Sequence, residues 1–213
     1  MDKSLVKINT NSKIALAKSK SLIEITNKIL ETKNDDWIKK LFKWANENDL
    51  SSDIIPRIES DLMNLEEINL SSDLSYSTCE SNLTLVGNFK NEYIHRTKIK
   101  FISKELFNLK KIKKFDCSNN DLNFIPKEIS NFKDLTSLNI SHNNINTLPD
   151  SIGELSSLEE LNFSFNELTS LPDNIIQLSN LKYLFMKNDN LTLTKNQEEW
   201  VAILNQRGGM IFT

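Results

Sequence analysis

Few side chains in this sequence could act as catalysts or metal ligands. The 213 residues include two histidines, His95 and His142, and two cysteines, Cys79 and Cys117. Neither histidine belongs to a serine or cysteine nucleophile motif, and no closely spaced cysteine pair offers zinc ligands. Cys117 stands at an apolar position of the repeat described below, which favours an inert buried thiol over a reactive one.

Patterns for phosphate binding and acid–base catalysis are also missing from the sequence. The four glycines are spread along the chain and form no phosphate-binding loop. The acidic pair Glu159 and Glu160 leads into a predicted strand, where solvated carboxylates are the simplest interpretation. We therefore expect no enzyme activity, no cofactor and no metal site.

Composition and charge favour a folded domain over a disordered or membrane-spanning chain. The formal net charge is −3, with 38% hydrophobic and 26% charged residues, four glycines and four prolines. No stretch approaches the roughly 20 apolar residues of a membrane span, and the first residues lack the apolar run of a secretory signal. Two cysteines cannot form a disulfide framework, which favours a reducing compartment, so we expect a cytoplasmic protein.

Three stretches of the chain repeat with a period of 23 residues, starting at Leu109, Phe132 and Leu155. They read LKKIKKFDCSNNDLNFIPKEISNF, FKDLTSLNISHNNINTLPDSIGEL and LSSLEELNFSFNELTSLPDNIIQL. Each has an asparagine and a proline in matching columns: Asn120, Asn143 and Asn166, and Pro126, Pro149 and Pro172. Several apolar columns match as well, and coincidence cannot maintain this agreement over three full periods.

These repeats resemble the leucine-rich repeat family, in its 23-residue class LxxLxLxxNxLxxLPxxIxxL. The resemblance implies an α/β solenoid that carries a parallel sheet on its concave side. The residues agree independently, because Leu138 and Ile140 alternate with polar residues as in a strand with one buried face. The asparagine of each repeat would satisfy backbone groups where the chain turns inward after the strand.

The period continues outward with less regularity, which predicts about five repeats over residues 62–194, three of them regular. Downstream, Asp189 falls in the asparagine column. Upstream, Ile94 and Ile99 are in register while Thr97 replaces the asparagine, which predicts a further strand in this region. The distance from Leu65 to Ile112 is 47 residues, one more than two periods, so one residue is inserted there.

Residues 1–61 carry no repeat and predict a helical N-terminal cap, with helices near 14–30 and 37–45 and a short third helix after Pro56. The stretches ALAKSKSLIEITNKIL (15–30) and WIKKLFKWANENDLSSDIIPR (37–57) are similar to the N-terminal module of uncharacterised bacterial leucine-rich repeat proteins, and this implies no activity. Residues 195–213 predict a capping helix, with Trp200, Ile203 and Leu204 inward, and a terminal strand at MIFT.

The concave face is the surface that the family commonly uses for partner proteins. Four outward columns are predicted for it, two within each strand and two just after it, and two clusters interrupt their small polar residues. The clusters are Phe165, Tyr183 and Phe185 with His142 at the C-terminal end, and Tyr93, His95 and Arg96 near the N-terminal end. An alternative is that the C-terminal helix or tail covers Tyr183 and Phe185.

Three functions therefore remain open. The first is a non-enzymatic scaffold or adaptor that binds an unidentified protein on its concave face, as a monomer or with weak self-association. The second is a binder of nucleic acid or another anionic ligand through residues 90–114, which hold nine Lys/Arg residues against two acids, although these charges scatter over several faces. The third is a structural module that self-associates through the aromatic residues of its cap.

Overall fold

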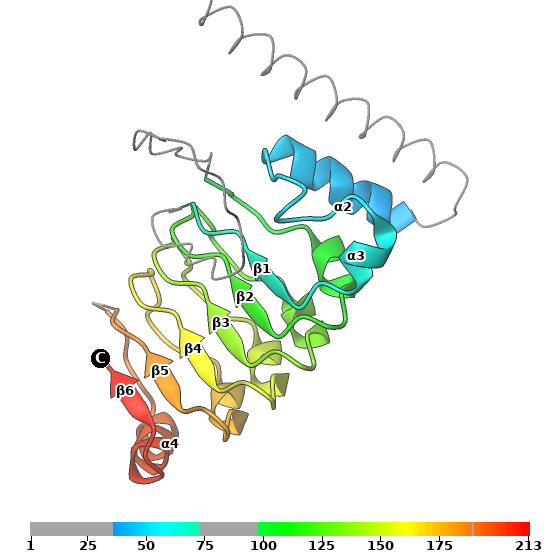
Figure 1. The fold of residues 1–213 in the computed structure, drawn as a ribbon. Helices are drawn as coiled ribbons and strands as arrows, with labels where there is room; N and C mark the ends of the chain where they lie inside the picture. The colour runs from blue at the N-terminus through cyan, green and yellow to red at the C-terminus, as the bar shows by residue number, and fades with distance from the viewer. Residues whose placement is uncertain (1–35, 73–97, 189) are drawn as a thin grey trace, which may run out of the picture.

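Each repeat folds into one short strand, a turn and one 3₁₀ helix (Figure 1). The computed structural model describes residues 36–72, 98–188 and 190–213. The helix predicted near 14–30 lies outside these residues, as do Cys79, Tyr93, His95 and Arg96. The strands are β1 (Glu67–Asn69), β2 (Lys114–Asp116), β3 (Ser137–Asn139), β4 (Glu160–Asn162), β5 (Tyr183–Phe185) and β6 (Met210–Phe212). The 3₁₀ helices are η2 (Lys104–Asn108), η3 (Lys127–Asn131), η4 (Asp150–Glu154) and η5 (Asp173–Gln177), and the α-helices are α2 (Asp36–Glu47), α3 (Glu59–Met63) and α4 (Lys195–Gln206).

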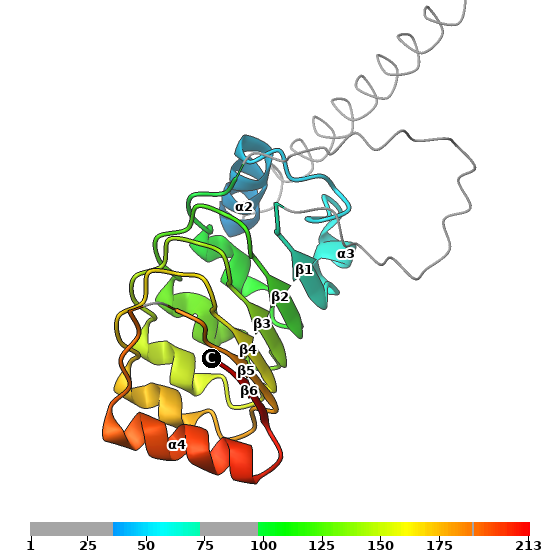
Figure 2. The same ribbon diagram turned by 90° about the vertical axis from the view of Figure 1, so that its left-hand side faces the viewer.

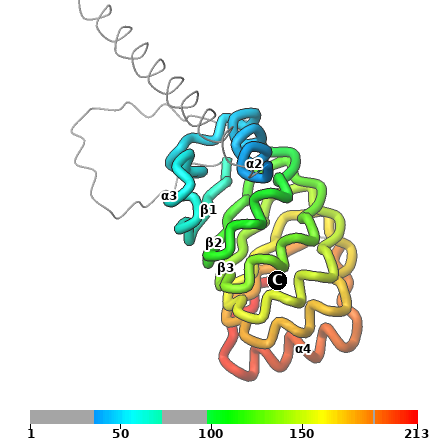
Figure 3. The backbone as a smooth tube through the Cα atoms, turned by 90° about the vertical axis from the view of Figure 1, so that its right-hand side faces the viewer, coloured from blue at the N-terminus to red at the C-terminus, as the bar shows by residue number. Residues whose placement is uncertain are grey.

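The strands form one parallel sheet in the order β1-β2-β3-β4-β5-β6. Its register follows the 23-residue period, since Ser137 pairs with Glu160 and Glu160 with Tyr183. The central residue of each of the first five strands is buried: Ile68, Phe115, Leu138, Leu161 and Leu184. The predicted α/β solenoid with a parallel sheet is therefore confirmed, and Figure 3 shows its stacked turns from the side of the 3₁₀ helices.

The prediction of a strand near residues 91–97 within the sheet is wrong. Strand β1 pairs directly with β2, with Glu67 opposite Lys114, so no strand lies between them. Residues 73–97 lie outside the described part of the chain, and the distance from β1 to β2 is close to two periods. Tyr93, His95 and Arg96 lie outside the described residues, so their place on the concave face stays a prediction.

The core lies between the sheet and the 3₁₀ helices. Three phenylalanines pack near its N-terminal end, where the ring centroids of Phe107 and Phe132 are 5.0 Å apart and those of Phe115 and Phe132 are 5.7 Å apart. In the regular repeats a proline directly precedes each 3₁₀ helix. Its fixed φ suits an extended residue at that entrance, which fits the predicted return on the convex side.

Helix α2 covers the N-terminal end of the coil and α4 covers the C-terminal end (Figure 2). The indole Nε1 of Trp44 donates a hydrogen bond to the Phe101 carbonyl at 3.0 Å, which connects α2 to the segment that leads into η2. Arg57 is buried beside α2, where its guanidinium donates to the Leu50 carbonyl and to Asn46 Oδ1 at 2.9 Å each. Burial lowers the pKa of Arg57 because it disfavours the charged form.

Helix α4 begins with a capping box between Thr194 and Gln197, and its Trp200 and Leu204 are buried. The prediction that Ile203 points inward is wrong, because 46% of it is exposed. Residues 200 and 204 lie one turn apart on the buried face, whereas 203 falls at its margin. No helix among residues 36–72, 98–188 and 190–213 is long and apolar enough to cross a bilayer.

The tail extends the sheet at its C-terminal edge. Strand β6 pairs with β5, placing Met210 beside Tyr183 and Phe212 beside Phe185. The Met186 amide donates to the Phe212 carbonyl at 2.8 Å. The predicted terminal strand at MIFT is present, and it lies next to Tyr183 rather than over it, since Tyr183 remains 41% exposed.

Gly153 stands at the closest approach between η4 and η5, and we predict that Gly153→Ala destabilises the fold. A Cβ at this position would lie 2.2 Å from the Asn174 carbonyl oxygen, so the backbone must shift. We expect a loss of about 1–3 kcal/mol in the free energy of unfolding, measured by urea denaturation. Ser130→Ala, at the same position one repeat earlier, serves as the control and should stay within about 0.5 kcal/mol. Equal stability of the two variants would contradict the close approach.

Candidate partner-binding surface

The outward residues of the strands form two columns on the concave face. They flank the buried central residue, so the alternation of a strand carries them to the opposite side of the sheet. The first column is Glu67, Lys114, Ser137, Glu160, Tyr183 and Met210, and the second is Asn69, Asp116, Asn139, Asn162, Phe185 and Phe212. Both columns are polar over β1–β4 and apolar or aromatic over β5 and β6.

The second column also starts the turn that follows each strand. Asp116 Oδ1 accepts hydrogen bonds from the Ser118 amide at 2.9 Å and the Ser118 hydroxyl at 2.7 Å. The same contact to the backbone amide recurs from Asn69 to Ser71, Asn139 to Ser141 and Asn162 to Ser164. These serines were predicted to be an outward column, and that prediction is wrong. They are buried, because the turn draws the chain inward at this point.

The residue after each of the last three serines has a left-handed backbone. The φ angle is 55° at Asn119, 53° at His142 and 57° at Phe165. Their amides continue the ladder between repeats, since the His142 amide donates to the Ser164 carbonyl at 3.0 Å and the Phe165 amide to the Lys187 carbonyl at 2.7 Å. Asparagine and histidine are comparatively frequent at positive φ, whereas a bulky residue such as phenylalanine is a true outlier.

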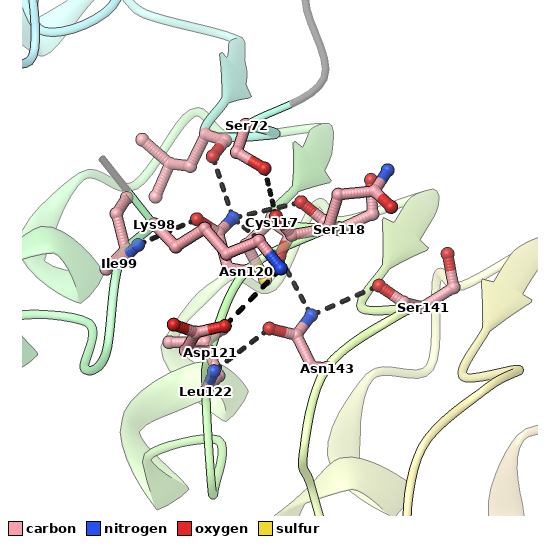
Figure 4. A network of polar contacts seen from close by, with 12 residues as sticks. Ser72, Lys98, Ile99, Cys117, Ser118, Asn120, Asp121, Leu122, Ser141 and Asn143 are labelled. Carbon is pink, nitrogen blue, oxygen red and sulfur yellow. Dashed lines mark hydrogen bonds and ion pairs between the residues drawn. The ribbon is translucent and has the colours of Figure 1, made fainter. Parts of the chain in front are cut away.

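The asparagine that follows each left-handed residue stabilises this turn through the hydrogen bonds of its side-chain amide. Figure 4 shows the Asn120 and Asn143 amides among the backbone groups of neighbouring turns. The Nδ2 group of Asn143 donates to three carbonyls, those of Cys117, Ile140 and Ser141, at 3.0–3.1 Å. Its Oδ1 accepts from the Leu122 amide of the preceding repeat at 3.0 Å. The predicted role of this column is therefore present in the structure.

The last member of this asparagine ladder differs from the one expected. Asp189 lies outside the described residues, and Asn188 makes the corresponding contacts. The Nδ2 group of Asn188 donates to the Phe163 and Met186 carbonyls at 3.3 Å each, and its Oδ1 accepts from the Asn166 amide at 2.8 Å. Asn188 thus belongs to the ladder, one position earlier than the residue that the period predicts.

Phe165 and His142 stack on each other at the end of the strands. Their ring centroids lie 4.4 Å apart with an angle of 18° between the planes, and the Lys187 ammonium lies 5.5 Å from the centroid of Phe165. Phe165 nevertheless remains 48% exposed, so the stack leaves much of the ring open to solvent.

A second stack joins the last two strands. The rings of Phe185 and Phe212 lie 4.4 Å apart and are almost parallel, at 4°. The predicted C-terminal cluster of Phe165, Tyr183, Phe185 and His142 is thus organised as two stacked pairs with Tyr183 exposed beside Met210. The sequence interpretation missed Met210 and Phe212, although the strand pattern of MIFT carried the signal. We call the six residues the concave aromatic surface: His142, Phe165, Tyr183, Phe185, Met210 and Phe212.

Three lysines of the basic region at residues 90–114 form ion pairs with carboxylates. Lys113 lies 2.9 Å from Glu66, Lys114 lies 2.6 Å from Glu67, and Lys98 lies 3.5 Å from Asp121. The hydrogen bond and the charge of Lys113 lower the pKa of Glu66. These pairs offset the charge of three lysines in this region, whereas Lys90 and Arg96 lie outside the described residues, so the nucleic-acid alternative stays a prediction.

Of the two cysteines, Cys117 lies among the described residues as a free thiol. Cys117 is fully buried, and burial raises the pKa of its thiol well above the usual range, so the nucleophilic thiolate is disfavoured. Within residues 36–72, 98–188 and 190–213, no group of three or more His, Cys, Asp or Glu side chains is placed to hold a metal ion.

The comparisons with known proteins agree with the repeat geometry. A family model described as leucine rich repeat matches residues 93–145 and 133–191. Residues 93–191 are leucine-rich repeats. Proteins of this family generally mediate protein–protein interactions and are typically not enzymes. No curated protein matches the chain.

Solved structures that resemble the leucine-rich repeat domain come from bacteria and plants. A leucine-rich repeat protein of Leptospira interrogans is 31% identical over 55% of this chain and 29% of its own, with a TM-score of 0.47. The ectodomain of the Arabidopsis thaliana receptor kinase GASSHO1/SCHENGEN3, in complex with CASPARIAN STRIP INTEGRITY FACTOR 2, is 31% identical over 60% of this chain and 13% of its own, with a TM-score of 0.46. An internalin of Listeria monocytogenes is 18% identical over 72% of this chain and 42% of its own, with a TM-score of 0.43. The chain spans less than half the length of each of these proteins.

We predict that Cys117 of the leucine-rich repeat domain resists alkylation while the protein is folded. The thiol is fully buried and stays protonated at pH 8. Alkylation therefore requires local or global unfolding of the domain. Peptide mass spectrometry after iodoacetamide treatment should show modification at least about 100-fold slower in buffer than in urea. Rapid labelling of the folded protein would mean that this position is accessible.

We also predict that Phe165→Asn leaves the stability of the domain nearly unchanged. Asparagine, which occupies the same column at Asn119, relieves about 1–2 kcal/mol of left-handed backbone strain. The lost stack on His142 offsets this by about 0.5–1.5 kcal/mol. Urea denaturation should place the variant within about 1 kcal/mol of the wild type. Phe163→Ala, at a buried ring two residues earlier, is the control and should cost about 3–5 kcal/mol. A similar loss for both variants would make Phe165 part of the core.

Proposed function

We propose that this leucine-rich repeat domain is a non-enzymatic scaffold that binds a partner protein through the concave aromatic surface. The observation that carries the proposal is the conformation of Phe165. A half-exposed aromatic ring on a left-handed backbone carries strain that asparagine would avoid, yet the fold holds it in a stack at the edge of the concave face. Strain of this kind is concentrated at binding and catalytic sites.

The composition of the surface supports a protein partner. Aromatic residues and methionine are enriched in protein interfaces, and tyrosine is among the residues enriched in hot spots. The two stacked pairs hold their rings in fixed positions, so little side-chain entropy is lost when a partner covers them. The polar residues of β1–β4 would form the wetter part of the same interface.

The cysteines support a reducing compartment as the location of the domain. Cys117 is a buried free thiol, and a chain with so few cysteines gains nothing from an oxidising compartment. We therefore propose that the domain binds its partner in the cytoplasm of a bacterium, in line with the resemblance of its N-terminal segment. The partner's identity has to come from the capture experiment below.

The proposal predicts that single changes on the concave aromatic surface reduce binding without unfolding the domain. Tagged wild type, Phe165→Asn and Phe185→Ser are used to capture proteins from a lysate of the source cells. The partner found with the wild type is then purified and its affinity measured by calorimetry. We expect each variant to bind about 10–30-fold more weakly, as is usual for an interface hot spot.

Phe124→Ser is the matched control for this experiment. Phe124 is as exposed as Phe165 but lies on the flank of the coil, next to Thr147 of the following repeat. The control should bind the partner with wild-type affinity. Unchanged affinity of the folded Phe165→Asn variant would refute the proposed site, and a purely structural domain would capture no partner with any of the proteins.

A further inference from the structure

Strand β6 is the last strand of the sheet among the described residues, and its outer edge is open (Figure 1). Its inner edge pairs with β5, where the Met210 amide donates to the Lys182 carbonyl at 2.7 Å. The Phe212 carbonyl accepts from the Met186 amide at 2.8 Å. Alternate residues of a strand in a parallel ladder turn their backbone groups to opposite sides. The N–H and C=O groups of Ile211, between Met210 and Phe212, therefore point to the open edge.

Both faces of β6 carry apolar side chains that are incompletely covered. On the concave face, Met210 is 55% exposed and Phe212 is 46% exposed. On the inner face, Ile211 is only partly buried, whereas the central residues of β1–β5 are buried. Val201 of α4 is partly exposed at the same end of the core. An edge strand with these properties is a template for pairing with another strand.

We propose that β6 pairs antiparallel with β6 of a second copy of this chain, so that a two-fold axis joins two six-stranded sheets into one. Ile211 lies at the axis and exchanges both backbone hydrogen bonds with Ile211 of the second copy. In this register, Met210 of each copy lies opposite Phe212 of the other on the concave face, with Cβ atoms about 4.5–5.5 Å apart. The two concave aromatic surfaces thereby become continuous, and the pairing does not depend on the partner protein proposed above.

A second copy fits this edge because the edge is complementary to itself. The two-fold axis pairs Met210 with Phe212 on the concave face and Ile211 with Ile211 on the inner face, so apolar side chains meet on both. Helix α4 packs against β6, so the two copies of α4 run antiparallel. The first turn of α4 at Glu198 is then directed towards the end of the other α4 at Arg207, which brings opposite charges together. The contact is closed by its symmetry, so association stops at the dimer.

Sedimentation equilibrium of the full chain, with two double variants of β6, tests the register. Met210→Lys/Phe212→Lys puts ammonium groups opposite each other across the axis, whereas Met210→Lys/Phe212→Glu puts each ammonium opposite a carboxylate. Both variants remove the same apolar side chains. We expect the like-charge variant to have a dimer dissociation constant at least about tenfold above that of the opposite-charge variant.

Amide hydrogen exchange, resolved by residue with NMR, tests the backbone pairing. The Ile211 amide of the wild type should exchange at least about tenfold more slowly at high than at low protein concentration. The Phe212 amide faces β5, so its exchange should depend little on dimer formation. Ile211→Pro removes the donor at the open edge, where a proline is tolerated, and should abolish the dimer.

Phe124→Ser is the control for association through another apolar surface. Phe101 and Phe124 occupy one column on the flank of the coil, 23 residues apart, and are 51% and 54% exposed. This variant should dimerise like the wild type. If Ile211→Pro detaches β6 from β5, seen as fast exchange of the Phe212 amide, the two charge variants decide.

Three results would overturn the proposal. The first is a wild type that stays monomeric at the highest concentration measured, which would leave the edge to a strand of another protein. The second is equal dimerisation of the two charge variants, and the third is loss of the dimer in Phe124→Ser. Either of these would show that self-association uses another surface.

Discussion

The buried backbone at the end of each strand is the constraint on which this fold depends. The chain must turn inward there, and its carbonyls point into the core where water cannot reach them. A single asparagine amide satisfies three of them and also accepts a hydrogen bond from the preceding repeat, as Asn143 does for Cys117, Ile140, Ser141 and Leu122. Each unpaired group would cost about 1–3 kcal/mol, so no apolar residue can replace the amide.

This requirement also determines which positions the repeat leaves free for binding. The serine before the left-handed residue is buried by the turn, and the asparagine after it is committed to the backbone. The left-handed residue itself points away from the core, and its backbone conformation is supplied by its neighbours. A residue that would be unfavourable there on its own can therefore be tolerated, at the expense of some stability. His142 and Phe165 occupy two such positions in successive repeats, where the fold stacks them.

The sequence predicted the regular part of this structure well, because a strict period determines strand register, buried columns and turns together. The prediction of an extra strand was wrong where the distance between two successive strands is close to two periods. Residues 70–113 are close to two periods long, so they predict two repeats, but strand β1 pairs directly with β2, with Glu67 opposite Lys114. At the C-terminal end Asn188 makes the contacts of the asparagine column. The stacking of Phe212 on Phe185 agrees in part with the alternative that the tail covers Phe185. Contacts of this kind depend on the angle at which a non-repeating segment meets the last repeat, and no period encodes that angle.

The same column can therefore serve different purposes along the coil. Because the backbone of each repeat is held by its asparagine and its buried strand residue, the outward positions vary without affecting the fold. The column of Phe101 and Phe124 changes to Thr147 and Ser170, while the concave columns change in the opposite direction, from Glu67 and Asn69 to Tyr183 and Phe185. Apolar side chains thus gather on the flank at the N-terminal end and on the sheet at the C-terminal end. A solenoid that needed its outer residues for stability could not separate two surfaces in this way.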